Sequence, residues 1–230
     1  MAPSTIRAVS AAPGEEPMFL DGLRVRLRPL SPSDFVAWQA LRVRSEEWLT
    51  PWEPRRPPGS PDVVRSRSAF AARCRARDRE RQLGAGYGFG IFAGAPAGPT
   101  GPERRLCGEI NLNGVQRGPF QSAYVGYWID ESCAGRGYVP EALVVVIRFA
   151  FEDLKLHRLQ VAIVPRNRPS RRVVEKLGLR CEGTAERYLE INGVWEDHLR
   201  YAITAEEWEE RRDELTGQWL RPQGRRPARS

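Results

Sequence analysis

The feature that most constrains this chain is a strand-like segment that passes through a short glycine loop into an apolar helical segment. It spans residues 127–142 and reads YWIDESCAGRGYVPEA. Gly135 and Gly137 permit unusual backbone dihedrals and close approach to a ligand. A helix that begins directly after such a loop presents free N–H groups and the positive end of its dipole, and both favour a phosphate. The stretch therefore predicts a phosphate-binding turn between a strand and a buried helix.

The rest of the chain predicts alternating strands and helices. Strand patterns cover 23–28, 87–93, 106–115, 123–130 and 158–164, followed by a hairpin of 188–191 and 194–197. The hairpin turn is Asn192-Gly193, which suits a type I′ turn. Helix patterns begin at Ser31 and cover 62–81, 139–154 and 167–177, with a final helix opened by a capping box at Thr204 and ending near Thr216. This order predicts one α/β domain with a mixed sheet over 18–216, between a disordered segment 1–17 and a basic, disordered tail 217–230.

Composition excludes several classes of protein. The longest apolar run, Ala142 to Ile147, is too short to cross a membrane, and the N-terminus lacks the apolar part of a signal peptide. We therefore expect a cytoplasmic protein without membrane contact. The four cysteines are widely spaced and only two histidines are present, so no metal site is expected.

Charge leaves a second class of function open. The net charge is +7, and arginines concentrate in 55–81 and in 221–230. A solvated helix face and a loose tail explain this bias. A basic module that docks on RNA or the ribosome is the alternative from another class.

Further motifs stand in a fixed order along the chain. They are Gly108-Glu109-Ile110-Asn111-Leu112, Gly126-Tyr127-Trp128-Ile129, Gly135-Arg136-Gly137-Tyr138 with Glu141-Ala142, His157-Arg158, Asn167-x-x-Ser170 with Glu175-Lys176-Leu177-Gly178, and Gly193-x-Trp195-x-Asp197-His198. From about Leu23 to Ala202 the chain resembles the GNAT superfamily of N-acetyltransferases, and within it the RimJ/RimL-type protein N-terminal acetyltransferases. One departure is Ser132, which stands where the superfamily often has Gln or Arg.

The resemblance implies a fold and a reaction. The fold would be a single GNAT-type domain, with a mostly antiparallel twisted sheet of about six to seven strands and helices on both faces. Acetyl-CoA would be the cosubstrate, without a metal, and its acetyl group would pass directly to a primary amine. The first expectation for the acceptor is the N-terminal α-amine of a protein, possibly a ribosomal protein. A small amine such as an aminoglycoside, a polyamine or an amino acid is the alternative, and the enzyme would be a monomer or a homodimer.

The coenzyme residues follow from the loop and from the resemblance. N–H groups from about Cys133 to Tyr138 would face the pyrophosphate, with Arg136 adding charge. The resemblance implies that the strand end and the start of the 167–177 helix contact the pantetheine arm. The full expected set is Trp128, Ile129, Cys133, Ala134, Gly135, Arg136, Gly137, Tyr138, Asn167 and Ser170.

The expected catalytic residues are few, because an α-amine has a pKa of about 8 and needs little help to lose its proton. Glu109 is the leading candidate for the base, although it would equally suit a solvent-facing strand position, and His198 is the alternative base. Ser170 is a candidate acid for the departing thiolate or a serine that stabilises a helix start. Tyr188 is the alternative acid or a packing residue.

The acceptor amine is expected to meet residues from the first helices, the sheet and the hairpin. The expected acceptor-binding residues are Trp52, Asn111 and Asp197.

Overall fold

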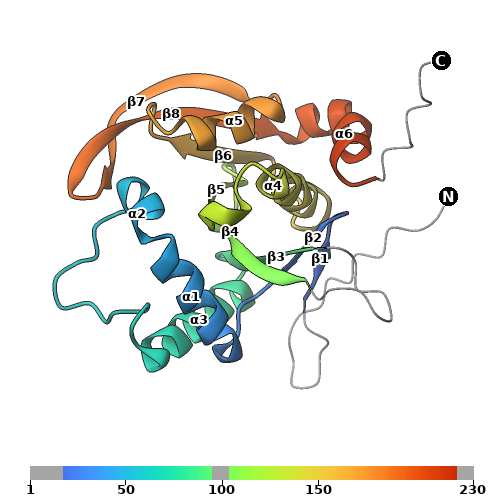
Figure 1. The fold of residues 1–230 in the computed structure, drawn as a ribbon. Coiled ribbons are helices and arrows are strands. Elements are labelled where there is room, and N and C mark those ends of the chain that lie inside the picture. The colour runs from blue at the N-terminus through green and yellow to red at the C-terminus, as the bar shows by residue number, and fades with distance from the viewer. Residues whose placement is uncertain (1–17, 95–103, 222–230) are drawn as a thin grey trace, which may run out of the picture.

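The computed structural model describes residues 18–94 and 104–221, and these form an eight-stranded sheet with helices on both faces (Figure 1). The strand order is β1-β2-β3-β4-β5-β6-β8-β7. Every neighbouring pair is antiparallel except β5 with β6, which run parallel. The segment predicted for residues 1–17 and residues 222–230 of the tail predicted for 217–230 lie outside the described residues. The last helix continues to Trp219, so the prediction that it ends near Thr216 and that the disordered tail begins at 217 is wrong.

The strands and helices alternate along the chain. The strands are β1 (Leu20–Asp21), β2 (Val25–Arg28), β3 (Tyr87–Ala93), β4 (Arg105–Gln116), β5 (Ser122–Ile129), β6 (Arg158–Ile163), β7 (Arg180–Ile191) and β8 (Val194–Thr204). The α-helices are α1 (Phe35–Arg44), α2 (Glu46–Leu49), α3 (Arg67–Gln82), α4 (Tyr138–Arg148), α5 (Arg168–Lys176) and α6 (Ala205–Trp219). Short 3₁₀ turns are η1 (Pro32–Asp34), η2 (Thr50–Trp52) and η3 (Glu131–Cys133), and a π turn, η4 (Phe149–Asp153), extends α4. No helix in these described ranges is both long and apolar enough to traverse a lipid bilayer.

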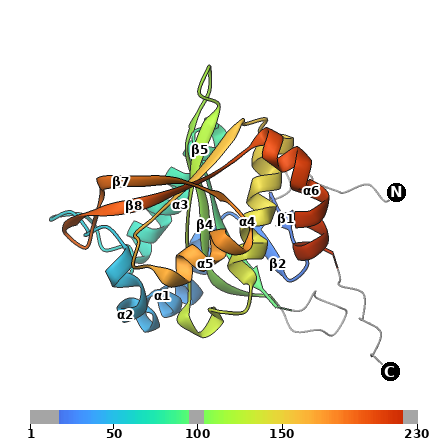
Figure 2. The same cartoon turned by 90° about the horizontal axis from the view of Figure 1, so that it is seen from above.

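Two hydrophobic clusters lie on the two faces of the sheet. The larger cluster packs α4, α5 and α6 against strand residues such as Ile110 and Val125. The smaller cluster packs Trp38 of α1 and Phe70 of α3 against Leu106. Figure 2 shows α1 and α3 on one side of the sheet and α4 and α6 on the other. The burial of α4 between the sheet and its neighbouring helices explains why its sequence is apolar nearly all round.

The central parallel pair is short, and this shapes the molecule. β5 and β6 are in register only from Ser122↔Arg158 to Tyr124↔Gln160, although β5 continues to Ile129 and β6 to Ile163. Beyond these three pairs the two strands diverge. The second half of β5 therefore has a strand partner on its β4 side alone.

Most predicted elements are present, and the differences have local causes. The two-residue β1 raises the strand count above the predicted six to seven. The hairpin turn has φ of +48° at Asn192 and +87° at Gly193, as a type I′ turn requires, but its strands extend far beyond the predicted segments. β7 is exposed along nearly its whole length, so it lacks the alternation that marks a half-buried strand. The helix predicted for 139–154 gives way to η4, where Leu154 N–H donates to Phe149 O at 3.0 Å.

Candidate active site

The divergence of β5 and β6 opens a cleft of about 570 Å³ beside the glycine loop. Its walls come from β5, the loop, the start of α4, α5, and the α2–η2 segment. Of the residues predicted from sequence, nine line it: Trp128, Ile129, Cys133, Ala134, Gly135, Gly137, Tyr138, Asn167 and Ser170. Trp52, predicted for the acceptor, lines it as well. The cleft is large enough for the arm and pyrophosphate of a nucleotide-bearing coenzyme.

The glycine loop adopts the conformation that its glycines allow. Gly135 has φ of +74° and Gly137 has φ of +80°, both in the left-handed region. Gly137 caps α4, and an added Cβ at Gly135 would meet no atom within 4 Å. The first N–H groups of α4 have no acceptor within the helix, so they remain available to an anion at this end of the cleft.

The donors of the loop begin later than the sequence suggests. Cys133 N–H donates to Asp130 O at 2.9 Å, and Ala134 N–H donates to Glu131 O at 3.0 Å. These two residues contribute to the wall of the cleft, but their N–H groups are already used within the η3 turn. Arg136 is exposed and is not among the residues that line the cleft. The backbone from Gly135 onward is therefore the part that can bind a pyrophosphate.

An anionic residue fixes the start of the loop. The buried Asp130 accepts hydrogen bonds from Ser45 Oγ at 2.8 Å, Ser132 Oγ at 2.7 Å and the Arg44 guanidinium. Burial alone would raise the pKa of this carboxyl, but these hydrogen bonds hold its pKa well below its usual range. Asp130 thus stays ionised and ties the loop to the end of α1.

Two hydroxyl groups meet inside the cleft. Tyr127 OH donates to Ser170 O at 3.1 Å, and Ser170 Oγ lies 3.1 Å from the same phenol oxygen. Ser170 is further fixed by Asn167, whose side-chain oxygen accepts its backbone N–H at 3.1 Å and so caps α5. Burial raises the pKa of Tyr127, which therefore keeps its proton across the physiological range. The pair is a local source of hydroxyl protons beside the wall where the coenzyme arm would lie.

The wall of the cleft formed by the α2–η2 segment is aromatic and carries one carboxylate. Trp48, Trp52 and Glu53 line it. Both oxygens of Glu53 accept hydrogen bonds from the Arg42 guanidinium, each at 2.6 Å. The hairpin tip closes over this segment, because Asn192 N–H donates to Glu53 O at 2.8 Å.

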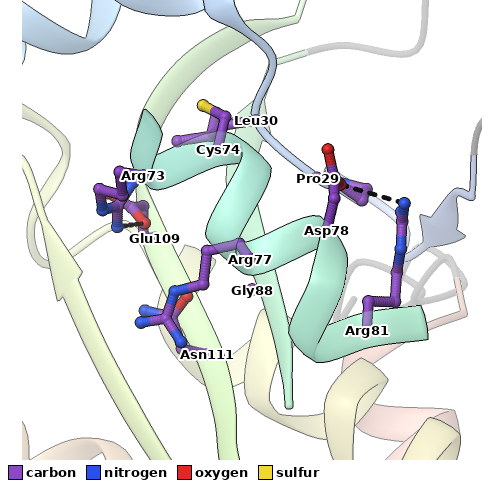
Figure 3. A pocket seen from close by; sticks show the side chains of 10 residues that line it. All are labelled: Pro29, Leu30, Arg73, Cys74, Arg77, Asp78, Arg81, Gly88, Glu109 and Asn111. Carbon is purple, nitrogen blue, oxygen red and sulfur yellow. Dashed lines mark hydrogen bonds and ion pairs between the residues drawn. The ribbon is translucent and has the colours of Figure 1, made fainter. Parts of the chain in front are cut away.

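Two predicted residues lie outside the cleft, on the face beneath α3. Glu109 and Asn111 line a separate cavity of about 10 Å³ (Figure 3). Glu109 is 2% exposed, and its carboxylate accepts hydrogen bonds from Trp38 Nε1 at 2.6 Å and from the Arg73 guanidinium. The prediction of a solvent-facing residue at this position is wrong. With both oxygens engaged, Glu109 is suited to holding α1 and α3 on the sheet.

Three predicted hairpin residues also stand apart from the lining of the cleft. Asp197 accepts the Arg187 N–H at 2.8 Å, within an irregular stretch of the β7–β8 pairing. His198 is buried, and its Nδ1 lies 2.9 Å from Glu196 O, so this nitrogen carries the proton and Nε2 is the basic one. Tyr188 packs edge-on against His198 with ring centroids 5.8 Å apart.

Some cleft residues were missed by the sequence reasoning. Tyr127 sits in the quoted strand motif, but nothing local indicates that its hydroxyl meets a helix that begins at residue 168. Arg172 and Lys176 of α5 also line the cleft, and their spacing of four residues places both on one face of that helix. That spacing is the sequence signal that would have identified them. Among the described residues, no group of three or more His, Cys, Asp or Glu side chains is placed to hold a metal ion.

Comparisons with known proteins agree with this architecture. The family model described as "Acetyltransferase (GNAT) domain" matches residues 24–180. The chain is 44% identical over 104 residues to "Probable N-acetyltransferase YjcK" of Bacillus subtilis (strain 168), and 36% identical over 106 residues to "[Ribosomal protein uS5]-alanine N-acetyltransferase" of Escherichia coli (strain K12). These matches cover 45% and 46% of the chain, and the chain spans 58% and 55% of the length of the two relatives.

A solved structure extends the likeness to nearly the whole fold. Mycobacterium smegmatis RimJ, solved in complex with CoA-disulfide, superposes with a TM-score of 0.76 and 32% identity. The superposition covers 88% of this chain and 96% of that one. The chain therefore belongs to the GNAT acetyltransferase family and is of the RimJ/RimL type.

Proposed function

We propose that this protein transfers an acetyl group from acetyl-CoA directly to a primary amine, and that the acceptor is the N-terminal α-amine of a protein. The observation that carries the proposal is the cleft between β5 and β6, with a glycine loop and the start of α4 at one end. That loop suits a pyrophosphate, and the cationic Arg172 and Lys176 along the wall suit the other phosphate of the coenzyme. The RimJ of Mycobacterium smegmatis, which has the same fold, was solved in complex with CoA-disulfide, and this supports a coenzyme A compound as the ligand.

The chemistry needs only side chains found in the cleft. The neutral amine attacks the thioester carbon, the C–N bond forms and the C–S bond breaks. The thiolate that leaves takes a proton from the Ser170 hydroxyl, and the serine regains a proton from water, while Tyr127 keeps its own proton and holds the serine oxygen in place. The amine releases its proton to water, because an α-amine with a pKa of about 8 is partly neutral at pH 7. This route assigns no role in proton transfer to Glu109, whose carboxylate is already held by Trp38 and Arg73.

The character of the acceptor end favours a protein terminus over a polycation. Glu53 is the only carboxylate among the residues that line the cleft, and Arg42 already neutralises it. An aminoglycoside or a polyamine carries several positive charges, which a complementary site would match with several unpaired carboxylates. A chain end carries a single amino group, which the tryptophan-lined opening can admit. The relative from Escherichia coli is named for the alanine of ribosomal protein uS5, and this supports an acceptor of the same class.

Thiol release from acetyl-CoA tests the proposal. The purified protein would be given peptides with a free Ala or Ser at the N-terminus and, separately, an aminoglycoside and a polyamine. We expect turnover with the peptides alone, and an acetylated α-amine by mass spectrometry. Turnover with the small amines alone would reject the acceptor assignment. Ser170→Ala and Tyr127→Phe should each reduce kcat by about tenfold or more with little change in the KM for acetyl-CoA.

A further inference from the structure

The glycine loop is held from behind by one arginine that the proposed reaction does not use. Arg24 lies directly before β2, far from the loop in sequence, and its side chain is 43% exposed. Its Nε donates to Glu141 Oε2 at 2.8 Å. Its Nη1 donates to Arg136 O at 2.9 Å and its Nη2 to Gly137 O at 3.3 Å. One guanidinium therefore joins a carboxylate of α4 to two consecutive carbonyl oxygens of the loop.

The carboxylate partner is fully enclosed. Glu141 is 0% exposed and also accepts the backbone N–H groups of Arg24 and Val25. Gly22 leaves the space for it, since a Cβ on that glycine would come within 2.7 Å of Glu141 Oε1. The start of β2 and the first turn of α4 are thus built around this one side chain, with Arg24 extending from it to the loop.

The direction of the two carbonyl groups determines the direction of two donors. In a planar trans peptide the C=O and the following N–H point in opposite directions. When Arg24 draws Arg136 O toward itself, the N–H of Gly137 must point away from it. The same holds for Gly137 O and the N–H of Tyr138. Gly137 and Tyr138 both line the cleft, so these are two of the N–H groups that an anion there would meet.

We propose that Arg24 is a positioning residue for coenzyme binding, which fixes the peptide planes of the loop so that the Gly137 and Tyr138 N–H groups face the pyrophosphate before the coenzyme arrives. A guanidinium is required, because it presents several N–H groups in a rigid fork, whereas a lysine ammonium on a flexible stem cannot bridge the three oxygens in fixed geometry. The inference rests on the proposed binding of acetyl-CoA at this loop.

The chain offers a control two residues further along, within β2. Arg26 is 44% exposed and pairs with Asp21 through Nε at 2.6 Å, and within the described part of the chain its guanidinium forms no hydrogen bond to the glycine loop. Substitution of Arg24 or of Arg26 removes the same charge from an arginine of similar exposure, although the partner Glu141 is buried and the partner Asp21 is 50% exposed. Glu141 keeps its two backbone donors when Arg24 is replaced, and thermal unfolding of each variant checks that the fold is retained.

The experiment compares Arg24→Gln, Arg24→Lys and Arg26→Gln with the unaltered protein. Calorimetric titration with coenzyme A gives the Kd, steady-state kinetics give kcat and KM, and hydrogen exchange without ligand gives the protection of residues 135–141. For Arg24→Gln we expect the Kd for coenzyme A to rise at least about tenfold, the KM for acetyl-CoA to rise with it, and kcat to change much less. Exchange in the loop should become faster in the ligand-free protein. Arg24→Lys should recover only part of the affinity, and Arg26→Gln should match the unaltered protein.

Three results would overturn the inference. They are unchanged affinity and exchange in Arg24→Gln, full recovery in Arg24→Lys, and an equal loss of affinity in Arg26→Gln. Full recovery by lysine would reduce Arg24 to a counter-ion of Glu141. If the unaltered protein itself fails to bind coenzyme A, the proposed function fails, while the exchange comparison still tests whether Arg24 fixes the loop.

Discussion

Replacement of Gly135 by alanine separates the binding role of the glycine loop from its backbone strain. Gly135 has φ of +74°, and a Cβ there meets nothing within 4 Å, so the substitution causes strain without a clash. A left-handed conformation costs a non-glycine residue about 1–2 kcal/mol. Replacing glycine by alanine also reduces the conformational freedom of the unfolded chain, and this stabilises the folded state by about 0.4–1 kcal/mol. The net loss in the free energy of unfolding is therefore about 1 kcal/mol, or roughly 2–4 °C in Tm for a chain of this size.

Gly59 provides the control for this strain. It has φ of +77°, and again no atom lies within 4 Å of an added Cβ, but it is not among the residues that line the cleft. Gly59→Ala should lose the same stability as Gly135→Ala. Only Gly135→Ala places a methyl group where the coenzyme phosphates approach, and it should raise the Kd for coenzyme A by more than about tenfold, or 1.4 kcal/mol.

Thermal unfolding and calorimetric titration of both variants are the assay. If Gly135→Ala binds coenzyme A as tightly as Gly59→Ala does, the loop is not the phosphate site and the reasoning fails. A loss of stability far larger in one variant than in the other would refute the strain argument.

Three further predictions concern other parts of the molecule. Glu109→Gln should lower the free energy of unfolding by up to roughly 3 kcal/mol, because Arg73 loses its buried anionic partner. Its pH–rate profile should stay unchanged, and loss of a limb of that profile would instead mark Glu109 as the base. The folded pKa of Asp130 lies below its unfolded value, so its pairing with Arg44 stabilises the fold above about pH 4 and is lost as the pH falls further. Asp130→Asn should be less stable at pH 7 in urea titrations, and it should lose less stability than the unaltered protein between pH 5 and pH 3. Cys181 is exposed while the other three thiols are buried, so Ellman's reagent should detect one fast thiol per folded chain; fast reaction in Cys181→Ser would contradict this.

Features set by local chemistry were predictable from sequence. The left-handed glycines of the loop, the type I′ turn at Asn192-Gly193 and the capping box at Thr204 all depend on residues close together in the chain. Each is a case in which one residue type satisfies a backbone requirement that few others meet. Nine of the ten residues predicted to contact the coenzyme line the cleft.

The side of the sheet on which a strand residue lies was not predictable. Glu109 and Asn111 alternate with Ile110 along β4, and both faces of this strand are covered. Alternation shows that two faces exist, but it does not show which one meets the cleft. Only the packing of α1 and α3, which brings Trp38 and Arg73 to Glu109, determines that face.

The pair of hydroxyl groups in the cleft illustrates a second limit. Tyr127 and Ser170 are 43 positions apart, and their contact arises because β5 and α5 meet across the cleft. From the sequence alone, a tyrosine at this position in a strand would be interpreted as a packing residue. The pairing of the two hydroxyls is a product of tertiary structure, which no spacing rule within either segment encodes.

The short β5–β6 pairing divides the sheet into two blocks, β1 to β5 and β6 with β8 and β7. Hydrogen bonds between the blocks within the sheet are limited to the ladder of three residue pairs, so local opening at this seam should require less free energy than opening of the longer ladders on either side of it. A ligand that binds residues of both blocks would hold the two blocks together. At a concentration one hundred times its Kd it would add about 2.7 kcal/mol to the free energy of unfolding. The occupied and empty forms should therefore differ in rigidity at the centre of the sheet, far more than at its edges.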